Sequence, residues 1–86
     1  ASFYDPASGR KMEVYTDLPG MQLYAGNYIN NGLIGKGGCT YGKRHGVAFE
    51  TQYFPNAINI PSFPQPIQKA GELTKTTTTY KFTTVS

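Results

Sequence analysis

The sequence predicts an all-β protein, and three observations carry that prediction. Its seven tyrosines, five phenylalanines and many threonines are residue types that favour β-strands. Ten glycines and six prolines supply the turns that a protein of many short strands requires. No stretch repeats its apolar residues at helical spacing, so no window predicts an amphipathic helix.

The length of 86 residues allows one small domain at most, with a marginal core. The single cysteine, Cys39, and the single histidine, His45, exclude an intrachain disulfide and a Cys/His zinc cluster. A lone cysteine is typical of a reducing compartment, which predicts a cytoplasmic protein. The first residues do not resemble a signal peptide, and the missing initiating methionine suggests a processed chain or a fragment.

The net charge of +3 comes from basic residues that are scattered along the chain. A nucleic-acid-binding surface usually shows a denser basic stripe, so no nucleic-acid partner is expected. No apolar run approaches the roughly 20 residues that a membrane-spanning helix needs, so no membrane partner is expected either.

Turn residues and alternating apolar residues divide the chain into about five strands. We expect a hairpin over residues 1–17, short strands over 21–25 and 45–52, and a long last strand over 72–85. Residues 26–44 are expected to form a glycine-rich irregular loop. Residues 53–71 are expected to form a connection whose backbone is restricted by prolines. Five strands with this many open edges are expected to be part of something larger.

Glu50 is the first candidate for chemistry. It lies in the mostly apolar stretch Val47–Phe54, where desolvation would raise the pKa of its carboxyl group toward the range that suits proton transfer. The alternative is an ordinary glutamate on a solvated strand face.

Gln22 and Gln52 are candidates for binding a sugar, because a side-chain amide can both donate to and accept from hydroxyl groups. The seven tyrosines are further candidates, since their rings can stack on sugar faces. The alternatives are glutamines on the wet face of a sheet and tyrosines that pack between strands.

Other reactive residues form no recognisable constellation. His45 would lie five residues from Glu50 on one strand, which places the two side chains on opposite faces. We therefore expect His45 to be a surface or loop-edge histidine. Cys39 is weak evidence for a nucleophile. The stretch 35–38 lacks the full pattern of a phosphate-binding loop.

In their order along the chain, several segments resemble the aldose 1-epimerase family. The resemblance rests on Tyr4-Asp5-Pro6-Ala7-Ser8-Gly9-Arg10, Glu13-Val14-Tyr15-Thr16-Asp17, Pro19-Gly20-Met21-Gln22-Leu23-Tyr24-Ala25-Gly26-Asn27-Tyr28, Phe49-Glu50-Thr51-Gln52, Phe54-Pro55-Asn56-Ala57-Ile58-Asn59, Phe63-Pro64, Ala70-Gly71-Glu72 and Thr79-Tyr80-Lys81-Phe82. Each segment alone is weak, but the ordered set is specific. The resemblance identifies residues 1–86 as a C-terminal segment of such a domain.

The resemblance implies an antiparallel β-sandwich, the galactose mutarotase-like supersandwich, with the sugar in an open cleft. It implies interconversion of the α and β anomers of aldohexoses such as galactose and glucose, without a cofactor or a metal. Glu50 matches the catalytic base, and Gln22 matches a glutamine that contacts the sugar. The acid histidine of the family would lie in the missing N-terminal part of the domain, either covalently attached or as a companion chain.

Two positions depart from the family's pattern. Lys43-Arg44-His45-Gly46 carries its histidine one place later than usual, which leaves the role of His45 open, and Asn56 stands where aspartate is common. The main alternative function is a non-catalytic sugar-binding or regulatory homologue with the same sandwich. A separately made β module acting as a partner surface and a hexose-6-phosphate epimerase are further alternatives, although the latter would need an arginine cluster for the phosphate.

Overall fold

A computed structural model describes residues 1–30 and 32–86, and it confirms the all-β prediction. The described residues form seven β-strands and two short 3-10 turns. In chain order these are β1 (Ser2–Tyr4), β2 (Arg10–Thr16), β3 (Gly20–Tyr24), β4 (Leu33–Ile34), η1 (Lys36–Gly38), β5 (Thr40–Tyr41), β6 (Ala48–Gln52), η2 (Ala57–Asn59) and β7 (Thr78–Thr84). In the part of the chain that is described, no helix is long and apolar enough to cross a membrane.

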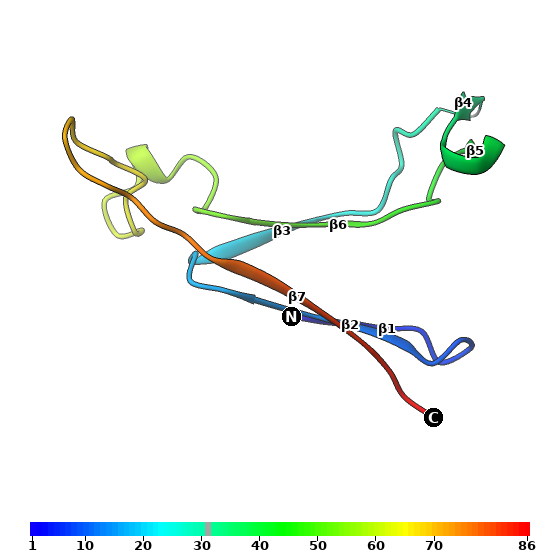
Figure 1. Cartoon of the computed structure of the whole chain (residues 1–86). Helices are drawn as coiled ribbons and strands as arrows, with labels where there is room; N and C mark the ends of the chain where they lie inside the picture. The colour runs from blue at the N-terminus through cyan, green and yellow to red at the C-terminus, as the bar shows by residue number, and fades with distance from the viewer. Residues whose placement is uncertain (31) are drawn as a thin grey trace. The chain divides into compact units, whose positions relative to one another are not determined.

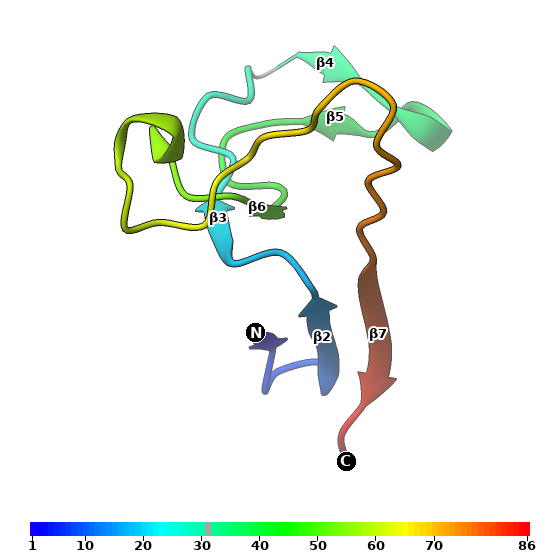
Figure 2. The ribbon, with the colours of Figure 1, turned by 90° about the vertical axis from the view of Figure 1, so that its left-hand side faces the viewer.

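The chain divides into two compact units. The first comprises Ala1–Gly20 and Thr51–Ser86, and the second comprises Met21–Glu50. The ribbon in Figures 1 and 2 shows β2 and β7 of the first unit lying side by side along their lengths. These two strands pair the start of the chain with its end.

The first unit is built on a three-stranded antiparallel sheet with the order β1-β2-β7. Residues on β2 pair with residues on β7 over the full length of both strands, from Arg10 opposite Thr84 to Thr16 opposite Thr78. The hairpin predicted over residues 1–17 is confirmed by the pairing of β1 with β2. Val14, in the middle of β2, is only 5% exposed, as expected for a residue on the apolar face of an alternating strand.

The turn of this hairpin is organised by Asp5. Its backbone carbonyl accepts the N–H of Gly9 at 2.8 Å, and its carboxylate accepts the Ser8 hydroxyl at 2.6 Å and the Ala7 N–H at 3.2 Å. These hydrogen bonds, led by that of Ser8, lower the pKa of the Asp5 carboxyl below its usual value of 3.8. The Asp-Pro sequence therefore makes the predicted turn through the aspartate side chain as well as through the backbone.

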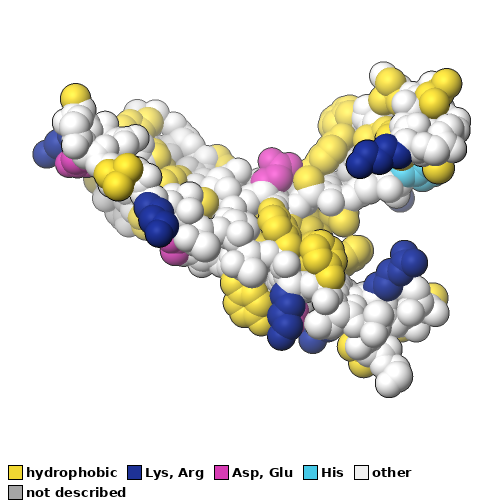
Figure 3. All heavy atoms as spheres, viewed as in Figure 1, with side chains coloured by type: hydrophobic (Ala, Val, Ile, Leu, Met, Phe, Trp, Pro, Cys, Tyr) yellow, Lys and Arg dark blue, Asp and Glu magenta, His cyan; other side chains and the backbone are white. Residues whose placement is uncertain are grey.

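The apolar core is small. Among the described residues, the buried apolar side chains are Val14, Phe49 at 8% exposure and Ala57 at 3%. Many large apolar side chains are exposed, among them Phe3, Tyr28, Leu73 and Phe82. Figure 3 shows such side chains, in yellow, at the surface of the molecule. An apolar surface of this kind is typical of strands whose packing partners are not part of the same segment.

The proline-pinned connection predicted over residues 53–71 is confirmed, and Gln65 holds its first half together. The side-chain amide of Gln65 donates to the backbone carbonyls of Ala57, Ile60 and Phe63 at 2.7, 3.0 and 3.0 Å. All three partners are acceptors, so the amide nitrogen and not the oxygen must face them. The rings of Phe54 and Phe63 also pack together in this connection, with centroids 5.0 Å apart.

Because three carbonyls converge on one amide nitrogen, we expect Gln65→Glu to destabilise the protein. The substitution keeps the size of the side chain but places a carboxylate against acceptors, which costs about 2 kcal/mol or more in the free energy of unfolding. Thermal or denaturant unfolding of the full-length protein measures this. Gln68→Glu is the matched control, because the amide of Gln68 makes one exposed hydrogen bond to the Glu72 carbonyl. Equal stability losses in the two variants would contradict the role given to Gln65.

Three of the predicted segments differ from the structure by more than one residue, whereas the strand expected over residues 21–25 is β3, Gly20–Tyr24. The loop predicted over residues 26–44 contains a small hairpin, in which Leu33 pairs with Tyr41 and Ile34 with Thr40. Strands of two residues carry no period that a sequence pattern can reveal, and Gly37 and Gly38 provide their turn with positive φ angles. Asn31, in the same predicted loop, lies outside the described residues.

The other two errors concern where strands begin. The strand predicted over residues 45–52 begins at Ala48, because residues 42–45 form a hydrogen-bonded turn. The strand predicted over residues 72–85 begins at Thr78, after a turn closed by the Glu72 N–H and the Lys69 carbonyl. The threonine-rich sequence begins before the part of β7 that pairs with β2. Strand propensity alone does not show where the partner strand ends.

Candidate functional site

The two predicted site residues lie on neighbouring strands of one sheet. Gln22 is the middle residue of β3, and Glu50 is the middle residue of β6. β3 and β6 are hydrogen-bonded to each other as a two-stranded sheet. Both residues also belong to the compact unit formed by Met21–Glu50. Segments that are 28 positions apart in the sequence are thus joined through their backbones at the candidate site.

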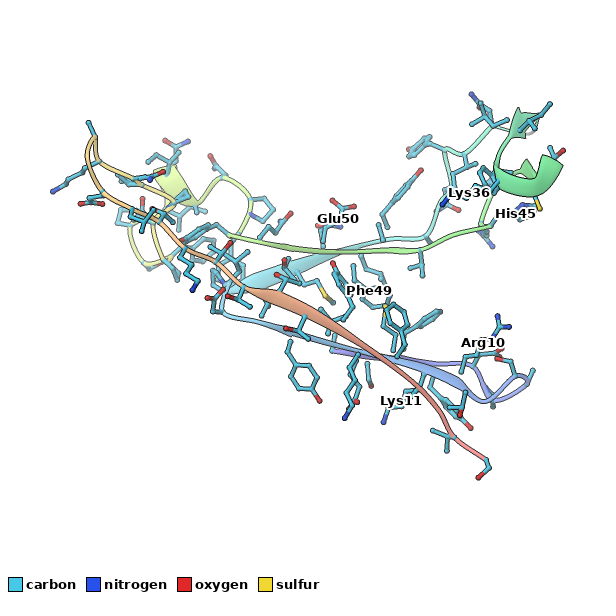
Figure 4. All side chains as sticks on the ribbon, in the orientation of Figure 1. Arg10, Lys11, Lys36, His45, Phe49 and Glu50 are labelled. Atoms are coloured by element: carbon cyan, nitrogen blue, oxygen red, sulfur yellow. The ribbon has the colours of Figure 1, made fainter. Side chains whose placement is uncertain are left out.

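Glu50 points away from the apolar residue that precedes it. In Figure 4 the side chains of Phe49 and Glu50 leave β6 on opposite sides, as neighbouring residues of a strand must. Phe49 is buried, and Glu50 is exposed. The expectation that apolar neighbours desolvate Glu50 is therefore wrong for this chain, because Glu50 is exposed and the large side chain next to it, Phe49, lies on the other face. The carboxylate is open to a ligand.

His45 is not on the strand that carries Glu50. It lies in the turn before β6, where its N–H donates to the Gly42 carbonyl at 3.1 Å and its Nδ1 accepts the Gly42 N–H at 3.0 Å. The earlier argument from strand parity therefore does not apply, although the expected loop-edge position is correct. Figure 4 shows His45 beyond the start of β6, away from Glu50. Through these two hydrogen bonds, His45 stabilises the turn.

A network of hydrogen bonds joins the end of β3 to the segment that leads into β6. The Gly26 carbonyl accepts the Arg44 N–H at 3.0 Å, and the Arg44 Nε donates to the Asn27 side chain at 3.0 Å. Gly26 is buried and has a φ of +73°, and a Cβ at this position would lie 2.8 Å from the Gly46 carbonyl oxygen. Only glycine suits this close approach of the two segments.

Two tyrosines follow Gln22 along this part of the chain. The rings of Tyr24 and Tyr28 are stacked, with centroids 6.4 Å apart and planes inclined by 7°. The Tyr24 hydroxyl oxygen accepts the backbone N–H of Tyr28 at 3.0 Å. The sequence suggested all seven tyrosines as candidates and did not distinguish this pair. The sequence feature that distinguishes this pair is its spacing: the two tyrosines are four residues apart, and Gly26, at which the chain turns, lies between them.

Two further candidates, Gln52 and Cys39, lie on different elements. Gln52 is half-buried at the end of β6. Cys39 is exposed in the hairpin of β4 and β5. In residues 1–30 and 32–86, no three histidine, cysteine, aspartate or glutamate side chains cluster so as to hold a metal ion.

Comparison with known proteins agrees with the resemblance seen in the sequence. The family model for aldose 1-epimerase matches residues 1–81. Galactose mutarotase from Homo sapiens is 45% identical over 82 residues, which cover 95% of this chain and 24% of that protein. Galactose mutarotase from Mus musculus is 46% identical over 76 residues, covering 88% of this chain and 22% of that protein.

A bacterial relative matches over nearly the same stretch. Aldose 1-epimerase from Escherichia coli (strain K12) is 34% identical over 74 residues, covering 84% of this chain and 21% of that protein. The chain thus spans about a quarter of the length of the curated relatives it matches. Since the family model covers nearly every residue, from the first hairpin to the last strand, this chain belongs to the aldose 1-epimerase family.

Proposed function

We propose that this chain is part of an aldose 1-epimerase that interconverts the α and β anomers of aldohexoses such as galactose and glucose. Glu50 is the general base, and Gln22 binds the sugar. The observation that supports the proposal is that Gln22 and Glu50 lie on the paired strands β3 and β6, in a chain that the family model matches over residues 1–81. The relatives are named galactose mutarotase and aldose 1-epimerase, which supports this class of reaction.

The reaction consists of balanced proton transfers. The Glu50 carboxylate takes the proton of the anomeric hydroxyl, and the electron pair of that O–H bond forms the carbonyl double bond of the open-chain aldehyde. The bond between the anomeric carbon and the ring oxygen breaks with its electron pair on the ring oxygen, to which an acid delivers a proton. Rotation about the bond between the first and second carbons, followed by the reverse transfers, closes the ring with the other configuration. The exposed carboxylate of Glu50 is accessible to a sugar hydroxyl, as this step requires.

The acid that protonates the ring oxygen is expected to come from outside residues 1–86. The only histidine, His45, has its Nδ1 engaged by the Gly42 N–H in a turn. The exposed apolar side chains of this chain are consistent with a further part of the domain that covers them and contributes the acid. We therefore propose that the N-terminal part of the family domain is the partner of this chain.

Polarimetry tests the proposed function. Freshly dissolved α-galactose or α-glucose changes its optical rotation as the anomers equilibrate, and the full-length protein should accelerate this change at micromolar concentration or below. A protein that binds the sugar without accelerating equilibration would be the non-catalytic homologue instead. A protein that neither binds nor accelerates would refute both functions.

Gln22 provides a test of the binding role. We expect Gln22→Ala to weaken sugar binding by the worth of one or two hydrogen bonds, about 1–3 kcal/mol. Titration calorimetry with 1,5-anhydrogalactitol measures this, since a sugar without an anomeric hydroxyl binds but does not react. Gln68→Ala is the control, because Gln68 lies in the other unit and its amide makes an exposed hydrogen bond to Glu72. An unchanged dissociation constant for Gln22→Ala would remove Gln22 from the site.

A further inference from the structure

We propose that Tyr24 and Tyr28 form an aromatic platform that holds the apolar face of the sugar ring beside Gln22 and Glu50. This inference rests on the proposed function and adds to it two residues that position the substrate. The platform is defined by the stacked rings of Tyr24 and Tyr28, which share one compact unit with both site residues.

The placement of the platform follows from the strand that carries it. Gln22 and Tyr24 are two residues apart on β3, so their side chains lie on the same face of the sheet. Two strand residues span about 7 Å, which is a separation that one hexose can bridge. Because the ring of Tyr28 stacks on the ring of Tyr24, it also lies near this face of the sheet. A sugar bound by Gln22 would therefore meet an aromatic surface next to it.

The platform is held in place before any ligand arrives. The Tyr28 N–H donates to the Tyr24 hydroxyl oxygen, and the Gly26 carbonyl between them accepts from both Ile29 and Arg44. The Arg44 side chain in turn fixes Asn27, the neighbour of Tyr28. Four hydrogen bonds, two within residues 24–29 and two from Arg44, fix the backbone on which the rings stand. A prearranged surface loses little conformational entropy on binding.

The side chain of Tyr28 is accessible to a ligand. Its side chain is 87% exposed although its backbone is bound and its ring is stacked on Tyr24. A pyranose presents C–H groups on one face, and the electron-rich face of an aromatic ring attracts such groups. Ligand sites commonly combine an aromatic wall with a few directed polar groups, as Tyr28, Gln22 and Glu50 would here.

The experiment measures sugar binding and turnover separately in the full-length protein. Tyr28→Leu should raise the dissociation constant of 1,5-anhydrogalactitol about tenfold, as expected for a lost stacking contact. Tyr28→Phe keeps the ring and should stay within about twofold of the unaltered protein. In Tyr28→Leu the KM for galactose should rise together with the dissociation constant, and the conservative Tyr28→Phe should restore both. Tyr4→Leu is the matched control, since Tyr4 is an exposed strand tyrosine of the other unit.

A second measurement needs no destabilising substitution. Protein labelled with 3-fluorotyrosine gives one fluorine resonance per tyrosine, and the signal of Tyr28 is the one missing from Tyr28→Phe. That resonance should shift when 1,5-anhydrogalactitol is added. A Tyr28 signal that does not move at saturation, or an unchanged dissociation constant for a folded Tyr28→Leu protein, would overturn the platform.

The outcomes also separate this inference from the proposed function. If Glu50→Gln keeps full turnover while Tyr28→Leu weakens binding, the assigned base is wrong and the platform stands. If Glu50→Gln abolishes turnover while Tyr28→Leu and the fluorine signal show no effect, the function stands and the platform is wrong.

Discussion

Glu50→Gln is expected to reduce the turnover of the full-length protein at least about a hundredfold, the usual loss when a general base is removed. Glutamine keeps the size and shape of the side chain but cannot take a proton at neutral pH. Because Glu50 is exposed and lies on the face of β6 opposite Phe49, the substitution should leave the packing of the strand unchanged. The rate of equilibration of fresh α-glucose, followed by polarimetry, reports the effect.

A control separates the lost base from a general effect of charge. Glu72→Gln makes the same chemical change in an exposed turn of the other unit, and its turnover should match that of the unaltered protein. Binding of 1,5-anhydrogalactitol should be similar in all three proteins, since this sugar offers no anomeric proton. If Glu50→Gln turns over α-glucose at a near-normal rate, Glu50 has no place in the mechanism.

The first hairpin shows what could be predicted from the sequence. Asp5 and Gly9 fix its turn through local hydrogen bonds, and alternation along β2 places Val14 in the core. Both features depend on residues close together in the chain, which a sequence pattern displays directly. The last strand was longer in prediction than in the structure, because its end is set by pairing with β2 more than 60 positions away.

Glu50 and Gln22 remain predictions as site residues. The family resemblance pointed to both, and the pairing of β3 with β6 places them in one sheet. The surroundings of Glu50 were not predicted correctly, because its large neighbour Phe49 points to the other side of β6. The contacts of Gly26 and Arg44 were not predicted at all, because they join segments through backbone groups that every residue carries.

The 86-residue chain alone is expected not to catalyse mutarotation beyond the effect of a free carboxylate. Ring opening requires a base at the anomeric hydroxyl and an acid at the ring oxygen, held in fixed positions. This chain offers Glu50 for the first role, whereas its only histidine lies in a turn with its Nδ1 already bonded to the Gly42 N–H.

The small core leads to the same expectation. Val14, Phe49 and Ala57 are the buried apolar side chains of the described residues, and so few cannot offset the conformational entropy of ordering the chain. Adding a polypeptide that carries the N-terminal part of the family domain should therefore restore both a folded particle and mutarotase activity. Size-exclusion chromatography and polarimetry of the chain with and without that polypeptide make the test. If the chain alone is a folded monomer that accelerates mutarotation as the complete protein does, its acid must be sought among its own residues, starting with the tyrosines nearest Glu50.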